Sequence, residues 1–204
     1  MRKKNVKNTE NKKEEIMRQA FRLMARKGIK EISMREIADA CGVTKPVLYY
    51  YFKDKEDLCS QMICGEMGSS QKILEQYINE GESFEEILCF ILSGYICIDE
   101  DPLLMTGFFI HLNSFAAASP VMAKHLEDFQ RTSFNLFKKM LDEQYKKGYI
   151  TAKARDMGLH LILANVAHLV LHGGSKDLKF NSDYARDMAR MILCALQYKG
   201  ENNK

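Results

Sequence analysis

Apolar residues recur every three to four positions along most of this 204-residue chain, and helix start and stop signals bound each run. In residues 12–27, for example, Ile16, Ala20 and Met24 form one apolar stripe, and Gly28 follows as a stop signal. Only three prolines interrupt the chain, and the polar–apolar alternation typical of strands is rare. The pattern predicts an all-α protein of about nine helices.

The expected helices begin at recognisable caps. Ser33 and Glu36 form a capping box, in which each side chain accepts a hydrogen bond from the other residue's amide, and Ser83 and Glu86 form a second. Residues 1–11 carry almost nothing to bury and are expected to form a flexible arm. The nine expected helices cover residues 12–27, 33–41, 44–52, 55–78, 83–98, 101–118, 120–147, 151–171 and 181–198.

The net charge of +3 conceals an asymmetry between the two ends of the chain. Residues 1–58 hold 15 Lys and Arg against 9 Asp and Glu, whereas the remainder holds 15 against 18. A basic module joined to a mildly acidic one indicates a polyanionic partner for the first module only. We therefore expect a nucleic-acid-binding domain in residues 1–58 and a second domain in residues 59–204.

Composition also excludes several protein classes. No run of about 18 apolar residues occurs, and the polar start of the chain lacks the apolar centre of a signal peptide, so a cytoplasmic protein is expected. The six cysteines form no C-x-x-C pair, which is typical of buried or free thiols rather than of a disulfide framework. We find no phosphate-binding glycine loop, G-x-S-x-G or H-E-x-x-H motif, and expect neither an enzyme nor a cofactor.

Two short helices joined by Gly42-Val43 form a candidate helix-turn-helix. Leu48 and Phe52, four residues apart, are expected to face inward. The residues left on the outer face of the second helix are Pro46, Val47, Tyr49 and Tyr50. In a major groove, a valine can meet a thymine methyl and tyrosine hydroxyls can bond phosphates.

Further polar side chains are expected to join this face. Thr44 and Lys45 lie at the helix start, where recognition helices touch base edges, although Thr44 can also cap that helix. Lys55 lies in the first turn of the next helix, whose amides favour a phosphate. Ser33 and Arg35 are expected to contact the DNA backbone from the first helix of the pair. Three-helix modules with exposed tyrosines also serve as protein-binding surfaces, and this alternative stays open.

The stretch around this pair resembles the N-terminal signature of the TetR/AcrR family of bacterial regulators. The resemblance rests on residues 32–58, ISMREIADACGVTKPVLYYYFKDKEDL, and extends over about residues 12–60. It implies DNA contacts by Thr44, Lys45, Pro46, Val47, Tyr49, Tyr50 and Lys55, with support from Ser33 and Arg35. Tyr51 stands where many members have histidine, and we include it among the DNA contacts.

The resemblance also implies a helical regulatory domain with a ligand pocket, and a dimer made by the last two helices. The last helix carries Met188, Met191, Ile192, Ala195 and Leu196, which suit a four-helix dimer interface. Soft apolar bulk in the second domain favours a small hydrophobic or amphipathic ligand, although each residue can equally be ordinary core. The candidate pocket residues are Phe90, Tyr95, Met105, Phe108, Phe109, His111, Phe137, Met140 and His168.

Three histidines lie in one predicted helix. His168 and His172 are one turn apart, a spacing that can hold a metal, and His160 lies two turns before His168. We favour a place in a dimer or pocket wall and expect no metal, since no acidic or cysteine partner lies at ligand spacing. A cysteine redox sensor, built from Cys89 and Cys97 or from Cys59 and Cys64, is a further alternative.

The predicted function is that of a homodimeric transcriptional regulator of a pseudo-palindromic DNA operator. A ligand would tilt the helix of residues 55–78, which joins the two domains, and Gly65 and Gly68 would localise the bend. The spacing of the two recognition helices would then no longer match successive grooves. Repression relieved by the ligand is the favoured polarity. The alternative is a helical protein-interaction module or a redox- or metal-sensing regulator.

Overall fold

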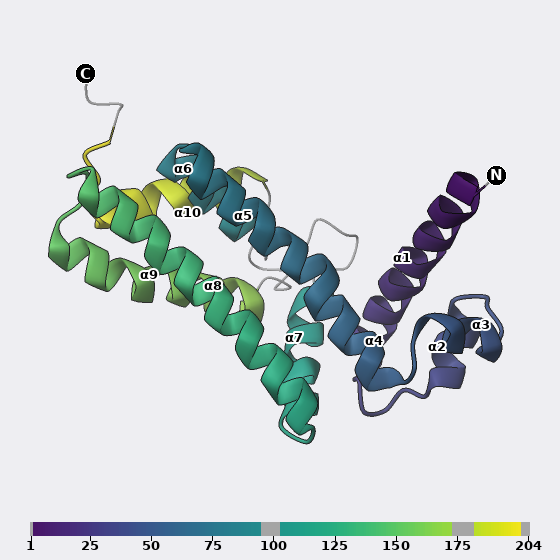
Figure 1. Ribbon diagram of the computed structural model, residues 1–204. Coiled ribbons are helices and arrows are strands. Elements are labelled where there is room, and N and C mark those ends of the chain that lie inside the picture. The colour runs from purple at the N-terminus through teal and green to yellow at the C-terminus, as the bar shows by residue number, and fades with distance from the viewer. Residues whose placement is uncertain (1, 95–102, 173–181, 201–204) are drawn as a thin grey trace. The chain divides into compact units, whose positions relative to one another are not determined.

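The computed structural model describes residues 2–94, 103–172 and 182–200. Within these ranges every regular element is a helix, which confirms the predicted all-α class (Figure 1). The elements are α1 (Arg2–Lys27), α2 (Met34–Ala40), α3 (Lys45–Tyr51), α4 (Lys55–Met62), the π-helical turn η1 (Ile63–Met67), α5 (Gly68–Glu80), α6 (Phe84–Ser93), α7 (Leu103–Ala116), α8 (Pro120–Lys146), α9 (Ala152–His172) and α10 (Ser182–Ala195). None of these helices is long and apolar enough to cross a membrane.

The helix predicted over residues 55–78 is interrupted near Gly65 and Gly68, as expected. α4, η1 and α5 follow one another without a gap, and the π-helical turn contains Gly65 and ends immediately before Gly68. Single π-helical turns are a recognised cause of a break in an α-helix. Taken as one interrupted helix, these elements give nine helices in the described ranges, the number predicted.

The structure differs from the expected flexible N-terminal arm in its secondary structure, because α1 begins at Arg2 and residues 2–11 are helical. Lys and Glu are good helix formers, and extending an existing helix is far easier than nucleating a new one. The prediction counted only residues that could be buried and so missed an extension that needs no buried face.

Two other helix ends differ from the prediction. α6 ends at Ser93, and residues 95–98 of the predicted helix lie outside the described residues. α10 ends at Ala195 rather than near Tyr198, because the backbone turns left-handed at Gln197, where φ is +51°.

The chain divides into two compact units. The N-terminal unit comprises Met1–Met67 together with Gly107–Glu127. Its core is apolar and draws on α1 to α4: Ile16, Ala20 and Met24 of α1 are fully buried, as are Ile37 of α2 and Leu48 of α3. These residues are the inward stripes that the helical periodicity predicted.

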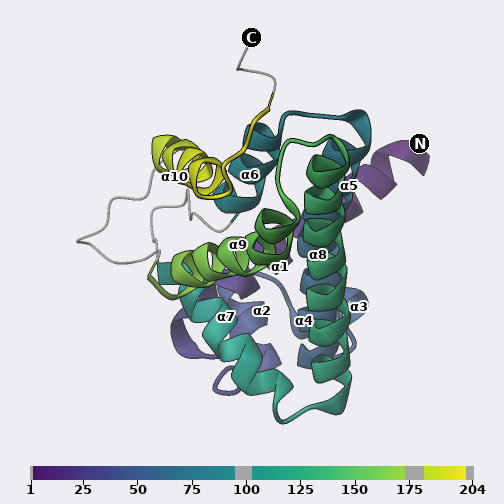
Figure 2. The ribbon, with the colours of Figure 1, turned by 90° about the vertical axis from the view of Figure 1, so that its left-hand side faces the viewer.

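The C-terminal unit comprises Gly68–Thr106 and Asp128–Lys204. Its core gathers apolar side chains from α5, α6, α8, α9 and α10, among them Leu88, Met140 and Ile162, each fully buried. Helices α6 and α10 lie side by side, as Figures 1 and 2 both show. Ion pairs from Arg186 and Arg190 of α10 to Glu85 of α6 support this pairing.

The division between the units differs from the predicted domain boundary after residue 58. All of α4 and the turn η1 belong to the N-terminal unit, since Leu58, Cys59 and Ile63 are buried in it. Most of α7, from Gly107 to its end, and the start of α8 also belong to this unit. Such an association between distant segments leaves no mark in local hydrophobic periodicity.

Candidate nucleic-acid interface

The capping box predicted at the start of α2 is present in full. The Glu36 amide donates to the Ser33 hydroxyl oxygen at 3.2 Å, and the Ser33 amide donates to the Glu36 carboxylate at 2.9 Å. The hydrogen bonds from the Ser33 amide and hydroxyl lower the pKa of the Glu36 carboxyl. Stabilisation from this carboxylate is present above its usual pKa and is lost as the pH falls through the lowered value. The box fixes where α2 begins.

Replacing Ser33 by alanine tests this cap. We expect the free energy of unfolding to fall by about 1 kcal/mol, because the Glu36 amide loses its acceptor. The thermal midpoint should fall by about 2–4 °C, measured by circular dichroism. Ser114→Ala is the matched control at an exposed position inside α7 and should leave the midpoint nearly unchanged. Equal midpoints for the two variants would contradict the cap.

The turn between α2 and α3 depends on Gly42. Its φ is +61°, a left-handed conformation that side-chain-bearing residues rarely adopt. The amides of Gly42 and Val43 donate back to the carbonyls of Asp39 and Ala38, at 3.2 and 3.0 Å. These bonds close the end of α2 and set the direction in which α3 leaves.

Helix α3 has one buried and one exposed face, as predicted. Leu48 is fully buried, and so is Phe52, which follows the last residue of α3. On the outer face, Val47 is 38%, Tyr49 51% and Tyr50 76% exposed. Pro46 occupies the first turn, where its missing N–H leaves no helical hydrogen bond unmade. The exposed face of α3 therefore carries apolar and hydroxyl-bearing side chains that do not pack in the core of the N-terminal unit.

The polar residues at the start of α3 are also exposed. Thr44 has the extended backbone of an N-cap residue, but its side chain makes no capping hydrogen bond. Thr44 therefore occupies the predicted N-cap position without capping the helix through its hydroxyl. Lys45 is exposed beside it. Both side chains therefore lie at the helix end from which base edges are usually contacted.

Tyr51 differs from its two tyrosine neighbours because it is half-buried. Its ring packs edge-on against Tyr50, with 5.0 Å between ring centroids, and its centroid lies 6.2 Å from that of Phe52. Its carbonyl accepts a long hydrogen bond of 3.4 Å from Gln61 of α4. Through this ring contact, Tyr51 can hold the Tyr50 side chain in its exposed orientation.

Lys55 and Arg35 are placed differently from each other. The Lys55 ammonium donates to the carbonyl oxygens of Ile32 and Lys30, at 2.6 and 3.1 Å, and so ties α4 to the loop before α2. Two of its three N–H bonds are used there, which leaves one for a phosphate. Arg35 is 73% exposed and has a 3.8 Å contact with Asp39, a weak surface pair that a phosphate can replace.

The start of α4 is occupied by its own carboxylates. The Asp54 side chain accepts from the Asp57 amide at 2.8 Å, and the Asp57 side chain accepts from the Lys53 amide at 2.8 Å. Sequence reasoning assigned this helix start to a phosphate. The second of these hydrogen bonds depends on loop geometry that sequence spacing alone did not indicate.

The candidate pocket residues that the structure describes are divided between the two units. Phe108 and His111 lie in the N-terminal unit, where the Phe108 ring lies 4.7 Å from that of Phe21 and His111 lies against Gly28. Phe137 and Met140 belong to the core of the C-terminal unit. The others that the structure describes, all half-buried, are Phe90, Met105, Phe109 and His168. Tyr95 lies outside the described residues.

The histidines and cysteines form no metal site within the described ranges, where no group of three potential ligands is suitably placed. The rings of His168 and His172 lie 5.2 Å apart. Burial raises the pKa of the Cys59 thiol to about 12, and burial also raises that of Cys89. Raised pKa values disfavour both as reactive thiolates. Cys64 is exposed, and Cys97 lies outside the described residues.

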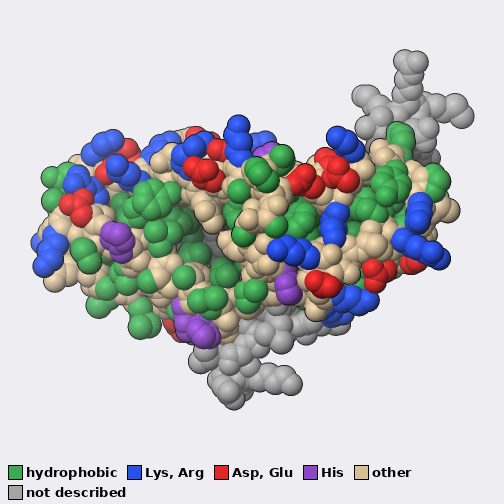
Figure 3. Space-filling view, turned by 90° about the horizontal axis from the view of Figure 1, so that it is seen from below, with side chains coloured by type: hydrophobic (Ala, Val, Ile, Leu, Met, Phe, Trp, Pro, Cys, Tyr) green, Lys and Arg blue, Asp and Glu red, His purple; other side chains and the backbone are tan. Residues whose placement is uncertain are grey.

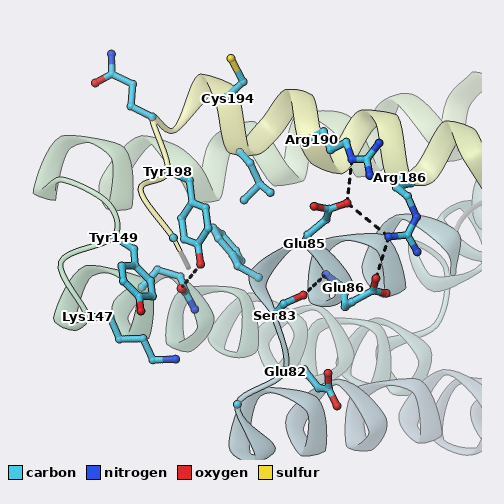
Figure 4. A pocket seen from close by; sticks show the side chains of 16 residues that line it. Glu82, Ser83, Glu85, Glu86, Lys147, Tyr149, Arg186, Arg190, Cys194 and Tyr198 are labelled. Carbon is cyan, nitrogen blue, oxygen red and sulfur yellow. Dashed lines mark hydrogen bonds and ion pairs between the residues drawn. The ribbon is translucent and has the colours of Figure 1, made fainter. Parts of the chain in front are cut away.

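A groove of about 760 Å³ in the C-terminal unit was not predicted. It lies between the start of α6, the end of α8 and the outer side of α10 (Figure 4). The Ser83 hydroxyl accepts from the Glu86 amide, but the Glu86 carboxylate pairs with Arg186 at 2.9 Å rather than completing the second predicted capping box. The partners are 100 residues apart in the chain, so sequence spacing gave no signal for this contact.

The comparisons with known proteins agree with this geometry. The pattern of the family described as "Bacterial regulatory proteins, tetR family" matches residues 16–62, from α1 to the end of α4. The N-terminal unit carries a TetR-family domain. The resemblance seen in the sequence is confirmed for these residues, which include the exposed face of α3.

Curated relatives match part of the chain in sequence. The regulator AcrR of Shigella flexneri is 37% identical over 62 residues, which are 30% of this chain and 29% of AcrR. The fatty acid metabolism regulator of Bacillus subtilis is 27% identical over 84 residues, 41% of this chain and 43% of the relative. The chain thus matches less than half the length of these two relatives.

Solved structures resemble the chain over nearly its whole length. The Bacillus subtilis regulator FadR, solved with stearoyl-CoA, has a TM-score of 0.70 at 20% identity and covers 92% of this chain and 98% of its own. FadR from Bacillus halodurans has a TM-score of 0.71 at 21% identity and covers 92% and 97%. At this identity the likeness shows a shared fold.

Proposed function

We propose that the chain is a transcriptional repressor that binds a DNA operator as a homodimer and leaves it when a small molecule binds. The observation that carries the proposal is the outer face of α3, where Val47, Tyr49 and Tyr50 are exposed over a fully buried Leu48. The match to the TetR-family pattern over residues 16–62 supports the same reading.

The roles on DNA follow from the chemistry of each side chain. Thr44 and Lys45 would contact base edges, Val47 would meet a thymine methyl, and the hydroxyls of Tyr49 and Tyr50 would bond phosphates. Further contacts are assigned to Ser33, Arg35, Pro46, Tyr51 and Lys55. Since Lys45 and Arg35 carry exposed cations, affinity should fall steeply as salt rises.

A gel-shift titration tests operator binding. The full-length protein is titrated against DNA from upstream of its own gene and against a random duplex of equal length, each at two salt concentrations. The proposal expects preference for the upstream DNA and a loss of affinity for both duplexes at the higher salt. Equal, weak affinity for both duplexes, with a co-eluting protein partner in size exclusion, would favour the protein-interaction alternative.

The surface of α9 supports a dimer through the last two helices. From Met157 to Leu171, the exposed residues of α9 are spaced by three and four positions, and both end residues are 57% exposed. This is the spacing of a helix-packing seam. The five residues are Met157, His160, Ala164, Ala167 and Leu171. His160 thus lies on the seam, in keeping with the favoured place of these histidines in a dimer wall.

The last helix contributes fewer residues to this surface than its sequence suggested. Ile192 and Leu196 are 2% and 3% exposed because they pack in the core of their own unit. Met191 is 71% exposed, and Ala195 is exposed beside it. We therefore assign Met191 and Ala195 to the dimer contact, together with the α9 seam.

Introducing a charge at the centre of the α9 seam tests the dimer. Ala164→Glu should raise the dimer dissociation constant by on the order of 100-fold, because an unpaired carboxylate would be buried at the contact. Lys138→Glu is the control, since Lys138 is exposed in the same unit but lies on α8 rather than on α9. Sedimentation over a range of concentrations measures both. A dimer unaffected by Ala164→Glu would contradict the assigned interface.

Contacts inside the N-terminal unit offer a route by which a ligand could act on the DNA-binding helices. The Ser119 hydroxyl, at the start of α8, donates to the Glu56 carboxylate of α4. One turn further along α4, the Ser60 hydroxyl lies 2.8 Å from His125 Nδ1 of α8. A shift of α8 would therefore carry α4 with it, and α4 follows directly on the α3 segment.

Release by a ligand is tested on the protein–operator complex. FadR of Bacillus subtilis was solved with stearoyl-CoA, and the C-terminal unit here is rich in apolar residues, so stearoyl-CoA and free long-chain fatty acids are suitable first compounds. A regulatory ligand should weaken operator binding by about 5- to 150-fold. Tightened binding by the same compounds would reverse the proposed polarity and indicate a co-repressor.

A further inference from the structure

The buried hydroxyl of Thr106 has no hydrogen-bond partner. Thr106 is 8% exposed, and its Oγ1 is the one buried side-chain nitrogen or oxygen without a partner in the part of the chain that the structure describes. Native proteins pair the large majority of such atoms, because a buried polar group without a partner is destabilising. The hydroxyl is therefore a candidate for pairing with something other than the protein.

The neighbours of Thr106 along α7 are apolar. Leu104 and Phe108 are buried at 2% and 1% exposure, and Met105 is half-buried. The hydroxyl is thus a single polar group within an apolar stretch of helix. Sites for small amphipathic molecules have this composition, in which an apolar wall carries few polar groups and those groups fix orientation.

The next residue along the helix makes a close contact with α1. A Cβ added at Gly107 would overlap the carbonyl oxygen of Ala25, which is a backbone atom and cannot move aside. Thr106 is the last α7 residue of the C-terminal unit, and Gly107 is the first of the N-terminal unit. A displacement of α7 at Thr106 would therefore also move Gly107, the next residue, and change its contact with the Ala25 backbone.

We propose that the Thr106 hydroxyl is the polar anchor for the regulatory ligand. The ligand class is a small molecule with an oxygen acceptor, such as a carbonyl or carboxylate, beside an apolar body, and its binding alters the α7–α1 contact at Gly107. The inference rests on the proposed function, since it assigns a residue to the ligand-responsive site.

A covalent mimic tests the anchor without the natural ligand. Thr106→Cys is made in full-length protein that also carries Cys64→Ser, Cys97→Ser and Cys194→Ser, and is treated with benzyl methanethiosulfonate. The thiolate attacks the reagent's sulfenyl sulfur, and methanesulfinate leaves, which places a benzyl group where the ligand would lie. We expect one label per chain by mass spectrometry and operator affinity weakened by about 5- to 150-fold, restored by dithiothreitol.

Two controls accompany this labelling. The background protein keeps Cys41, Cys59 and Cys89, so it is treated with the reagent in parallel. Its operator affinity should not change, and Thr106→Cys should take up one label per chain more than it does. Thr132→Cys, at an exposed position on α8, should take the label without any change in operator affinity. Labelling of Thr106→Cys only after unfolding, or labelling without loss of affinity, overturns the proposal. If the protein that carries only the three serine substitutions binds no DNA, this result contradicts the proposed function rather than the assignment of Thr106.

A second variant tests the hydroxyl in the free protein, independently of DNA. Thr106→Val keeps the shape of the side chain and removes the unpaired polar group, so the thermal midpoint should rise by about 2–6 °C. Thr132→Val is the control, because the Thr132 hydroxyl is exposed and already donates to the Asp128 carbonyl at 2.9 Å. A lower midpoint for Thr106→Val would mean that the hydroxyl has a partner within the protein, which overturns the proposal.

Discussion

Replacing Tyr49 and Tyr50 together by alanine is expected to weaken operator binding by on the order of 100-fold. Each hydroxyl–phosphate hydrogen bond contributes about 0.5–1.5 kcal/mol, and a dimer would make each contact twice. Folding stability should be unaffected, because Tyr49 and Tyr50 are 51% and 76% exposed and the packing of α3 rests on Leu48 and Phe52. Affinity is measured by fluorescence anisotropy and stability by thermal unfolding.

The control for this variant is an exposed aromatic residue outside the proposed interface. Phe134 of α8 is 42% exposed, and Phe134→Ala should leave operator affinity unchanged. The loss in the tyrosine variant should also extend to random DNA, since phosphate contacts carry little sequence information. Equal affinity in the two variants would remove the tyrosines from the interface.

Replacing Gly107 by alanine is expected to give the largest loss of stability among the single substitutions considered. The added Cβ would overlap the Ala25 carbonyl oxygen, so α7 or α1 must move as a whole. Overpacking of this kind costs about 1–3 kcal/mol, which lowers the thermal midpoint by about 2–12 °C in a chain of this length. Thermal unfolding measures the midpoint directly.

Gly65→Ala is the matched control for this substitution. Gly65 lies in η1, and a Cβ added there meets nothing within 4 Å, so the midpoint should hold or rise slightly. Operator affinity of Gly107→Ala is measured below its midpoint, where the displaced α7 should also alter DNA binding. A midpoint equal to that of Gly65→Ala would mean that α7 does not lie against α1 in solution.

The helix-turn-helix could be predicted because its signals are local. Ser33 and Glu36 are three residues apart, and Gly42 lies two residues after the end of α2, so hydrogen bonds within one turn settle both ends of that helix. Leu48 and Phe52 differ by one helical turn, which fixes the buried side of α3 and hence its exposed side. The positions of the candidate DNA contacts on α3 follow from these few residues.

The candidate ligand site could not be predicted in the same way. Phe108 and His111 were predicted as pocket residues from the aromatic and polar side chains of one helix. The structure adds that Phe108 lies against Phe21 and His111 against Gly28, about 85 residues away in the chain. Helical periodicity tells which side of α7 is buried but does not identify the helix that covers it. The burial of the Thr106 hydroxyl and its lack of a partner likewise depend on tertiary packing, which the local sequence does not indicate.

Dimethyl sulfate footprinting of the protein–operator complex tests most directly whether the exposed face of α3 enters the major groove. The reagent methylates guanine N7 in the major groove and adenine N3 in the minor groove, so each base reports on one groove. We expect guanines in two symmetric half-sites to be protected, and this protection to weaken for Lys45→Ala. Protection confined to adenine N3, or guanines that react as in free DNA at saturating protein, would contradict the account.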